Sequence, residues 1–252
     1  MDNRIEAEIN EKFRSATNRL VLLDYDGTLV NHTTEPETAR ISERISDIIK
    51  KLIDSPHTRI FIITGRGPGD IDSFLDHIPI NIIAEHGAII KDGGVWKNQI
   101  NDGVLWMKTI IPVLNEFTVK CPGSYIEEKK FSLTWHYRNA EPHLGYMCSR
   151  ELIHLLKKVI LPYNLKILDG NKVVEILMNE IGKGKAVKKL MEKDSYDFVL
   201  SIGDDATDEE MFEFFLNNPN AFTIKVGEGT TYARYQLQSI SNVESLLKKL
   251  SI

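Results

Sequence analysis

Two aspartates stand at the end of an apolar run near the start of the chain. The stretch "LVLLDYDGTLV", residues 20–30, places Asp24 and Asp26 two positions apart where the aliphatic residues stop. Carboxylates this close repel each other, and one of them tends to stay protonated unless a positive charge lies nearby. One interpretation is an ordinary acidic Asp-Gly turn. The other is a cation held between two acids, which makes the pair a candidate for metal binding and acid–base chemistry.

Three more polar clusters border apolar or helical segments. Thr64–Arg66 follows the run "TRIFII", and Gly203–Asp205, with Asp208 nearby, follows "FVLSI". A fourth cluster, Gly182–Lys185, opens a helical pattern, and its backbone N–H groups and lysines favour an anion. If these clusters converge, the chain combines an acidic site with an anion-binding site.

That combination suits phosphate-ester chemistry. Three or four carboxylates cannot share a crevice without a cation, and Mg²⁺ is the hard ion that takes a few carboxylates together with water and phosphate oxygens. An aspartate can then attack phosphorus, because the metal offsets the repulsion between two anions. A second aspartate two residues away can protonate the leaving alcohol and later deprotonate a water. The Thr64 hydroxyl and the Lys183 charge suit the phosphate oxygens.

The surrounding segments predict how these groups are positioned. "LVLLDYD", "TRIFIITGR" and "INIIAEHGAII" resemble buried strands, the third with a turn at Gly87. Between them, "ARISERISDIIKKLIDS" and "GDIDSFLDHI" show helical spacing. The order is that of a doubly wound parallel sheet, in which ligands bind at the carboxyl ends of the strands. We therefore expect the polar clusters to meet in one crevice.

The pattern changes in the middle of the chain. Residues 106–171 predict a helix, a strand "SYIEEKKFSLTWHYR", a second helix and the strand "LKILDG", with "KVVEILM" following. Alternation within residues 131–137 favours an antiparallel sheet with one solvent-facing side. Strand and helix patterns then alternate again to the end. We predict an α/β protein with a Rossmann-like parallel-sheet core, residues 1–106 and 173–252, and an inserted α+β cap, residues 107–172.

Composition excludes several classes of protein. The 252 residues are 42% hydrophobic and 27% charged, with a net charge of −5 and a pI near 5.8. No basic stripe suggests nucleic acid, and no apolar run reaches the ~20 residues that span a membrane. The charged N-terminus does not resemble a signal peptide. Cys121 and Cys148 are too few for a disulfide framework. We expect a soluble cytoplasmic protein.

The clusters resemble, in order, the four motifs of the haloacid dehalogenase-like phosphotransferases: "DYDGTL", "TGR", the lysine of "GKGKA", and "GDDATDE". The first is specific, whereas the second and third are weak alone. The resemblance covers nearly the whole chain and implies Asp24 as nucleophile and Asp26 as acid and base, with Thr64 and Lys183 completing the catalytic set. It implies Mg²⁺ on the Asp24 carboxylate and the Asp26 backbone carbonyl, with further acids from the fourth motif: Asp204, Asp205 and Asp208.

The inserted segment resembles the cap of trehalose-6-phosphate phosphatases, through "GSYIEEKKFSLTWHYRNAEP". That resemblance implies hydrolysis of trehalose 6-phosphate. Substrate-binding residues are expected on the second motif, Gly65 and Arg66, on the cap, Glu127, Lys129 and Arg138, and in "KVVEI" just after the cap, Glu175. The simpler interpretation of the charged cap residues is a solvated strand edge. The chain departs from the family pattern at Gly182, often Asn, and at Thr64, more usually Ser.

Two other functions remain open at this stage. One is hydrolysis of another sugar phosphate: sucrose phosphate, mannosylglycerate phosphate, glucosylglycerol phosphate or a range of hexose phosphates. The other is a phosphoacceptor receiver module, although such a module lacks both the second aspartate and a cap. The expected partner is a small sugar phosphate. Because the chain has no glycosyltransferase-sized extension, we expect any trehalose-phosphate synthase acting upstream to be a separate protein.

Overall fold

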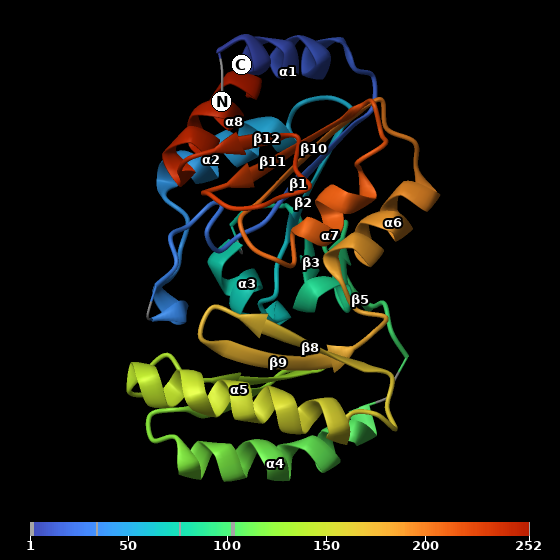
Figure 1. Cartoon of the computed structure of the whole chain (residues 1–252). Helices are drawn as coiled ribbons and strands as arrows, with labels where there is room; N and C mark the ends of the chain where they lie inside the picture. Colours follow the sequence, from blue (N-terminus) through green and yellow to red (C-terminus); the bar gives the residue numbers. More distant parts are fainter. Residues whose placement is uncertain (1–2, 34, 76, 102–103, 252) are drawn as a thin grey trace. The chain divides into compact units, whose positions relative to one another are not determined.

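The computed structural model describes residues 3–33, 35–75, 77–101 and 104–251 (Figure 1). The chain forms two compact units: unit 1 is Met1–Gln99 with Gly182–Ile252, and unit 2 is Ile100–Ile181. The boundaries lie at residues 99/100 and 181/182, where the sequence predicts 106/107 and 172/173. Within the described residues, none of the helices has the length and apolar character needed to cross a membrane.

Unit 1 is built on an eight-stranded sheet in the order β12-β11-β10-β1-β2-β3-β4-β5. The strands are β1 (Arg19–Leu23), β2 (Thr58–Ile63), β3 (Asn81–Ala84), β4 (Ile89–Asp92), β5 (Val95–Asn98), β10 (Phe198–Gly203), β11 (Ala221–Val226) and β12 (Tyr235–Leu237). All neighbours from β12 to β3 pair in parallel. The predicted parallel α/β core is therefore confirmed, with β1 at its centre.

Helices cover both faces of this sheet because β1 is apolar on both sides. The helices are α1 (Asn3–Ser15), α2 (Glu43–Ile53), α3 (Pro68–Leu75), α6 (Lys183–Lys193), α7 (Glu209–Phe214) and α8 (Ile240–Leu250). Leu20 and Leu22 of β1 pack with Val187 of α6 and Met211 of α7 in one core cluster. The alternate side chains of β1, Val21 and Leu23, are also fully buried, and α1, α2 and α8 form a second group of helices, apart from α6 and α7 (Figure 1). Burial on both faces explains the unbroken apolar run of β1.

Helix α2 shows how local sequence sets an element. Ser42 precedes it in an extended conformation, and its hydroxyl accepts a hydrogen bond from the Ile45 amide at 3.2 Å. This cap satisfies one of the free amides of the first turn. The isoleucines and the leucine at helical spacing are buried, namely Ile45, Ile48, Ile49 and Leu52. The predicted amphipathic helix is confirmed.

The predicted third strand is two strands. β3 ends at Ala84, a short 3-10 turn (η2, Glu85–Gly87) follows, and β4 returns antiparallel to β3. Glu85, His86 and Gly87 all have positive φ, at 45°, 55° and 110°, which reverses the chain. The turn at Gly87 is confirmed, but the single strand is wrong. β5 then pairs antiparallel with β4 and was given no element by the sequence pattern.

Unit 2 is a four-stranded antiparallel sheet, in the order β6-β7-β9-β8, with two long helices. The elements are the 3-10 turn η3 (Val104–Trp106), α4 (Met107–Lys120), β6 (Tyr125–Glu128), β7 (Ser132–His136), α5 (Pro142–Val159), β8 (Leu165–Gly170) and β9 (Val173–Met178). Leu133 and Trp135 of β7 pack with α4 and α5 in the core of this unit. β9 pairs with β7 and β8, so the predicted core boundary at residue 173 is wrong.

The central strand of unit 2 differs from expectation in two ways. The predicted strand "SYIEEKKFSLTWHYR" is divided into β6 and β7, which pair antiparallel. The sequence predicts that one face of residues 131–137 is exposed to solvent. On that face, however, the side chains of Ser132 and Thr134 are buried. Buried polar groups need hydrogen-bond partners, so this face is built for specific polar contacts.

Candidate active site

The first predicted aspartate is held by a buried lysine. Asp24 follows β1 directly, and its amide donates to the carbonyl of Ile202 on β10 at 2.9 Å. Lys183 is the first residue of α6, and its Nζ donates to Asp24 Oδ1 at 2.7 Å and to Asp208 Oδ1 at 2.8 Å. Asp24, Lys183 and Asp208 are each at most 4% exposed. Unit 1 therefore encloses one ammonium group between two carboxylates, and residues of the first, third and fourth motifs meet there.

This cluster holds more negative than positive charge. Burial raises the pKa of Asp24 to about 7; the charge of Lys183 opposes this, while Asp205 and Asp204 add to it. Burial also works against the charge of Lys183, but Asp208 and Asp24 outweigh that effect and raise the pKa of Lys183 well above its usual value. The ammonium therefore stays charged, whereas burial raises the pKa of Asp208 as well as that of Asp24 and so disfavours two ionised carboxylates here.

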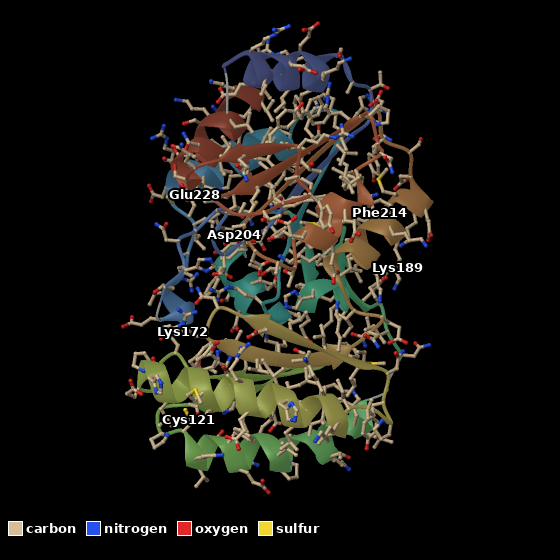
Figure 2. The ribbon with its side chains drawn as sticks, viewed as in Figure 1. Cys121, Lys172, Lys189, Asp204, Phe214 and Glu228 are labelled. Carbon is tan, nitrogen blue, oxygen red and sulfur yellow. The ribbon has the colours of Figure 1, made fainter. Side chains whose placement is uncertain are left out.

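The fourth motif supplies the other acids of the cluster. Asp204 follows β10 directly (Figure 2). Asp208 Oδ2 accepts the amides of Asp204 at 3.0 Å and Asp205 at 3.1 Å. Among the described residues, Asp24, Asp204 and Asp208 each offer a carboxylate oxygen, and these oxygens lie within 4.8 Å of one another. Three of the predicted metal ligands are thus close enough to share one ion.

Two carboxylate oxygens of these acids have no hydrogen-bond donor among the described residues. Asp24 Oδ2 and Asp204 Oδ1 are buried and accept no hydrogen bond from any described residue. A buried carboxylate oxygen without a partner is costly, so such atoms call for a ligand. A hard divalent cation coordinated by carboxylate oxygens would satisfy both. The donor set therefore fits a divalent metal ion.

Asp205 has a different environment from the other acids. Its Oδ1 accepts the Thr207 amide at 2.8 Å, the Thr207 hydroxyl at 2.7 Å and the Asp208 amide at 3.2 Å. Loss of solvent disfavours its charge, but Lys183 and the Thr207 hydrogen bond outweigh this and hold the pKa of Asp205 well below its usual value. The structure thus uses Asp205 to shape the loop that presents Asp208, and does not group it with the three close oxygens.

Asp26 is paired with the arginine of the second motif. Arg66 Nε donates to Asp26 Oδ2, and Arg66 Nη2 donates to Asp26 Oδ1, both at 2.7 Å. Such a two-point contact fixes the plane of a carboxylate. The Asp26 side chain remains 28% exposed, in contrast to Asp24. Arg66, predicted to bind substrate, is therefore engaged with the predicted acid and base.

The second motif is tightly fitted beside this pair. Thr64 is buried, its amide donates to the Ile83 carbonyl at 2.9 Å, and its hydroxyl accepts the Arg66 amide at 3.1 Å. Gly65 lies against His86: a Cβ at residue 65 would come within 2.5 Å of the imidazole Nε2. A side chain at residue 65 would therefore have to displace the His86 imidazole.

Gly27 is required for the geometry of the fourth motif. It has a φ of +86°, and a Cβ at this position would lie 2.1 Å from Asp204 Oδ2. The glycine therefore allows the left-handed turn and leaves room for the Asp204 carboxylate. The first and fourth motifs meet at this point.

Two residues near the site were not anticipated from the sequence. His32 Nε2 lies 2.9 Å from Asp204 Oδ2, and Lys225 Nζ donates to the Asp204 carbonyl at 2.7 Å. His32 lies in the polar stretch "VNHTTE", which has no periodicity to indicate where it points. Lys225 did carry a signal, because it is the one charged residue in the apolar strand "AFTIKV".

The predicted sugar-binding residues of unit 2 lie mostly on one face of its sheet. In the strand register, Glu127 of β6 and Glu175 of β9 both pair with Thr134 of β7, which places the three side chains in a row. Ser132 Oγ donates to Glu175 Oε1 at 2.6 Å, and Lys129 Nζ lies 3.4 Å from the same oxygen. Three of the four predicted sugar-binding residues, Glu127, Lys129 and Glu175, thus form one polar surface.

His136 and Arg138 complete the description of that strand. His136 Nε2 lies 2.7 Å from Glu127 Oε2, and the ring stacks on Tyr125 with centroids 4.6 Å apart. Burial disfavours the charge of Glu127, but His136 and Lys129 outweigh it and lower the pKa of Glu127. Arg138 donates to the Asn171 carbonyl at 2.8 Å, beyond the end of β7. This hydrogen bond ties Arg138 to the turn between β8 and β9.

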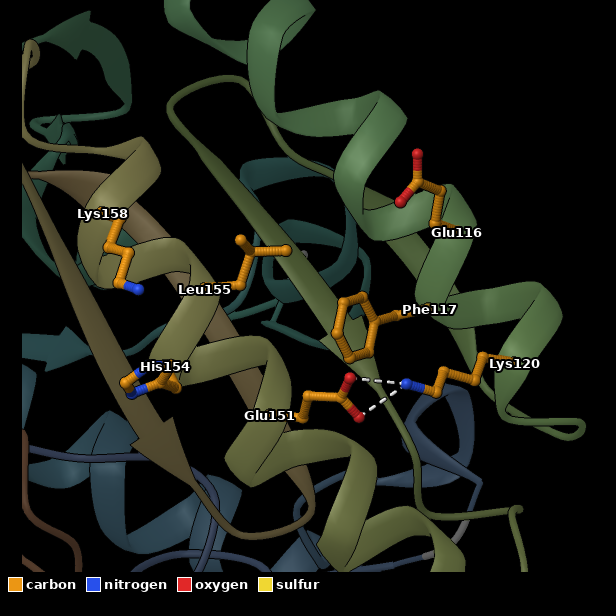
Figure 3. Close-up of a pocket in the computed structure, with 7 residues that line it drawn as sticks. All are labelled: Glu116, Phe117, Lys120, Glu151, His154, Leu155 and Lys158. Atoms are coloured by element: carbon orange, nitrogen blue, oxygen red, sulfur yellow. Dashed lines mark hydrogen bonds and ion pairs between the residues drawn. The ribbon is translucent and has the colours of Figure 1, made fainter.

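A surface groove of about 340 Å³ lies between the two helices of unit 2 (Figure 3). It is lined by Glu116, Phe117, Lys120, Glu151, His154, Leu155 and Lys158. Lys120 Nζ pairs with both carboxylate oxygens of Glu151 at 2.6 Å across this groove. None of its lining residues belongs to a predicted site, and the candidate active site is the aspartate cluster of unit 1.

A family model and similar proteins of known name point to the same family. The trehalose-phosphatase family model matches residues 22–241. A Dictyostelium discoideum protein named alpha,alpha-trehalose-phosphate synthase [UDP-forming] B is 38% identical over 97% of this chain, and the Saccharomyces cerevisiae trehalose-phosphatase is 36% identical over 80%. The chain spans only 32% and 25% of these two proteins, respectively.

Solved structures support the fold. The C-terminal domain of Candida albicans trehalose-6-phosphate phosphatase superposes with a TM-score of 0.92 at 29% identity, over 98% of this chain and 96% of that one. A haloacid dehalogenase-like hydrolase from B. subtilis, at 13% identity and a TM-score of 0.64, shares the fold alone. The α/β fold is therefore of the haloacid dehalogenase-like type. Since the family model covers most of the sequence, from β1 to α8, this chain belongs to the trehalose-phosphatase family.

Proposed function

We propose that this chain is a Mg²⁺-dependent phosphatase that hydrolyses trehalose 6-phosphate to trehalose and phosphate. The observation that carries the proposal is the buried cluster of Asp24, Lys183 and Asp208 with Asp204 beside it, in a member of the trehalose-phosphatase family. Phosphoryl transfer to a carboxylate needs a positioned nucleophile and a fixed positive charge. It also needs carboxylate oxygens that are free of hydrogen-bond donors and so available to a metal ion.

The metal site is part of this proposal. Phosphatases of this fold generally use a divalent metal, and the carboxylates of Asp24 and Asp204 would hold it through the two oxygens that accept no hydrogen bond. The Asp26 backbone carbonyl is the third proposed ligand, and Asp208 supports the set from the Lys183 side. Mg²⁺ fits these ligands because it prefers oxygen and retains water. Bound there, it would neutralise charge on the phosphoryl oxygens.

The reaction follows from the separate surroundings of the two aspartates. Asp24 attacks phosphorus, a bond forms between its carboxylate oxygen and phosphorus, and the bond to the sugar oxygen breaks. Asp26 gives its proton to that oxygen, and trehalose leaves. Asp26 then takes a proton from a water, whose oxygen attacks phosphorus, and phosphate and free Asp24 are released. Arg66 holds the Asp26 carboxyl in position through two hydrogen bonds.

The remaining predicted catalytic groups bind phosphate. Lys183 lies beside the nucleophile, so the same ammonium that holds Asp24 Oδ1 is placed to contact a phosphoryl oxygen. Thr64 would contribute its hydroxyl, which already accepts the Arg66 amide, and Gly65 would contribute its main chain. These groups offer hydrogen bonds to oxygens whose charge increases in the transition state.

The sugar is recognised by the polar face of unit 2. Glu127, Lys129 and Glu175 hold hydrogen-bonding groups in fixed positions on its sheet. A surface of this kind discriminates strongly, because an analogue lacking the matching hydroxyls leaves buried polar groups unpaired. We therefore assign substrate specificity to unit 2, residues 100–181, and phosphoryl chemistry to unit 1.

The metabolic setting is inferred from the relatives. The Thermoproteus tenax relative, 36% identical over 96% of this chain, is named a bifunctional trehalose-6-phosphate synthase/phosphatase. We propose that a trehalose-phosphate synthase activity supplies the substrate here as well, and that the reaction takes place in the cytoplasm. The free, buried thiols of Cys121 and Cys148 are consistent with a reducing compartment.

A substrate panel tests the assignment. Phosphate release is measured with Mg²⁺ on trehalose 6-phosphate, sucrose 6-phosphate, glucose 6-phosphate and p-nitrophenyl phosphate, for the wild type and for Glu127→Ala. We expect trehalose 6-phosphate to exceed the other sugars by at least ~10-fold in kcat/KM, about 1.4 kcal/mol of transition-state binding. Glu127→Ala should lower kcat/KM on trehalose 6-phosphate by ~10-fold or more and leave p-nitrophenyl phosphate nearly unchanged.

The exposed Glu151→Ala serves as a matched control, since it removes the same side chain from the outer helices of unit 2. Equal activity on all sugars contradicts the trehalose assignment and favours a broad hexose phosphatase. Equal losses for Glu127→Ala on both classes of ester contradict the role given to unit 2.

A further inference from the structure

Lys225 is a buried cation beside the aspartate cluster that the proposed reaction does not use. It lies on β11 and pairs in the parallel register with Gly203 of β10, the residue just before Asp204. The residue is only 7% exposed. Removing an ammonium group from water is costly unless it is paired. Lys225 is therefore stable at this position only if its ammonium group is paired.

The ammonium of Lys225 is held between two fixed partners. Its Nζ donates to the Asp204 carbonyl at 2.7 Å and lies 3.5 Å from Glu209 Oε1. Glu209 is itself fixed, because its Oε2 accepts the Tyr232 amide at 2.8 Å and the Thr231 hydroxyl at 3.1 Å. The lysine thus connects the main chain of Asp204 to the start of α7 and to the loop that precedes β12.

Asp204 is consequently held on both sides of its α-carbon. Its N–H donates to Asp208 Oδ2 at 3.0 Å, and its carbonyl accepts the Lys225 ammonium. With both peptide groups fixed, the direction of the Cα–Cβ bond of Asp204 is fixed as well, which limits where its carboxylate can lie. The carboxylate lies against Gly27, and its Oδ1 is buried with no hydrogen-bond donor among the described residues.

We propose that Lys225 is a positioning residue for the divalent metal, holding the main chain of Asp204 so that its carboxylate is presented to the ion. The inference rests on the metal site of the proposed function. Glu209 acts on Asp204 indirectly, because it is the ion-pair partner of the Lys225 ammonium. Such outer contacts of a metal ligand typically contribute 10–100-fold to metal affinity.

The direction in which metal affinity changes when the lysine is removed distinguishes a positioning residue from a charge that only lies nearby. A positive charge next to a cation site repels the ion, so removing a bystander lysine tightens metal binding. Removing a lysine that orients a ligand weakens metal binding. Metal affinity in the absence of substrate therefore distinguishes the two roles without any measurement of activity.

The experiment measures Mn²⁺ binding to the substrate-free full-length chain by electron paramagnetic resonance. Lys225→Met should raise the Kd for Mn²⁺ by ~10-fold or more. Lys225→Arg, which keeps a cationic donor, should recover part of the affinity, and Glu209→Gln should raise the Kd by a smaller factor. The control is Lys189→Met, which removes an exposed lysine from α6 and should leave the Kd unchanged.

The outcomes separate this inference from the proposed function. If the wild type binds no Mn²⁺, the metal site itself is overturned. If the wild type binds Mn²⁺ and Lys225→Met binds it equally well or more tightly, the positioning role alone is overturned. If circular dichroism shows that Lys225→Met does not fold, Glu209→Gln decides the question, and an unchanged Kd in that variant overturns the inference.

Discussion

At the scale of single residues, the two aspartates of the first motif are chemically distinct. Asp24 is 4% exposed and is held through one oxygen by Lys183, which leaves its other oxygen available to a metal or to phosphorus. Asp26 is partly exposed and is held in its plane by Arg66. A group at the edge of solvent can exchange protons with water, whereas a buried one cannot easily do so. The geometry favours Asp24 as nucleophile and Asp26 as acid and base.

Asp26→Asn tests that division of roles. A sugar oxygen leaves poorly unless it receives a proton, whereas p-nitrophenolate leaves without one. General acid catalysis contributes roughly 10²–10⁴-fold, so the variant should lose about that factor in single-turnover phosphorylation by trehalose 6-phosphate. With p-nitrophenyl phosphate the phosphorylation rate should fall far less, and the phosphoenzyme should accumulate because no base activates water. Rapid-quench measurement of both steps gives the answer.

Asp47→Asn is the matched control, because it makes the same change on the exposed side of α2 and should alter neither rate. Equal losses of the phosphorylation rate on both esters contradict proton donation by Asp26. In that case Asp26 acts only through its backbone and its contact with Arg66.

The sequence could predict which acids lie at the site, because their types and order follow the ends of predicted strands. It could not predict their partners. Nothing in "TGR" indicates that Arg66 pairs with Asp26 and not with substrate alone. The contact of His32 with Asp204 joins residues 172 positions apart and depends on a loop without periodicity. The hydrogen-bond partners of these residues depend on the tertiary structure, which the spacing of motifs in the sequence does not specify.

At the scale of elements, the turn after β1 decides whether the first and fourth motifs can meet. Gly27 N donates to the Val30 carbonyl at 2.7 Å, which closes the turn, and Gly27 itself is in the left-handed region. The position of the Asp204 carboxylate leaves no volume for a side chain at residue 27. The glycine is therefore a requirement of the site and not only of the turn.

Gly27→Ala should impair both stability and metal binding. A non-glycine residue in the left-handed region costs about 1–2 kcal/mol, and the added Cβ must displace the Asp204 carboxylate. We expect the free energy of unfolding to fall by about 1–3 kcal/mol and kcat/KM to fall by at least ~10-fold, with a higher apparent Kd for Mg²⁺. Urea denaturation and a Mg²⁺ titration of activity measure the two effects.

Gly67→Ala is the control for this substitution. No described heavy atom would lie within 4 Å of a Cβ at residue 67, and its φ is not positive. Its stability should stay within ~0.5 kcal/mol of wild type, with normal activity. A Gly27→Ala variant that binds Mg²⁺ as the wild type does contradicts the steric role assigned to this glycine.

The strands and helices that could be predicted are those with strong local patterns. β1 is a continuous apolar run, and α2 has four buried aliphatic residues at helical spacing. β5 could not be predicted, because "VWKN" is mostly exposed at the sheet edge and has no apolar face. The reversal between β3 and β4 depends on positive φ at Glu85 and His86, which side-chain type does not signal.

At the scale of the whole molecule, each unit has its own core. Unit 1 buries residues from both halves of the chain, such as Leu20 and Val199, while the core of unit 2 comes entirely from the insertion. The insertion itself could be predicted, since an antiparallel pattern interrupts a parallel one. Its end could not, because the apolar run of β9 would suit either sheet. Pairing with β7 and β8 decides the matter.

The site also makes the stability of the whole chain depend on pH. In the folded protein, burial raises the pKa of Asp24 to about 7, compared with about 4 for an aspartate in an unfolded chain. The folded state therefore binds this proton more tightly than the unfolded state does. It follows that the contribution of Asp24 to stability is fully present below about pH 4 and is lost as the pH rises towards 7.

Asp24→Asn should remove that loss, because asparagine cannot ionise. In metal-free protein with EDTA, we expect the variant and the wild type to be equally stable near pH 4, and the variant to be more stable by about 1–3 kcal/mol at pH 8. Urea denaturation across pH 4–8 measures the difference, with Asp47→Asn as a reference that should follow the wild type. Mg²⁺ at pH 8 should raise the Tm of the wild type far more than that of the variant, because a ligand stabilises only the state that binds it. Two outcomes contradict this account: a difference in the free energy of unfolding that does not depend on pH, and a wild type that becomes more stable relative to the variant as the pH rises. Either would show that the buried carboxylate of Asp24 is not what destabilises the metal-free protein.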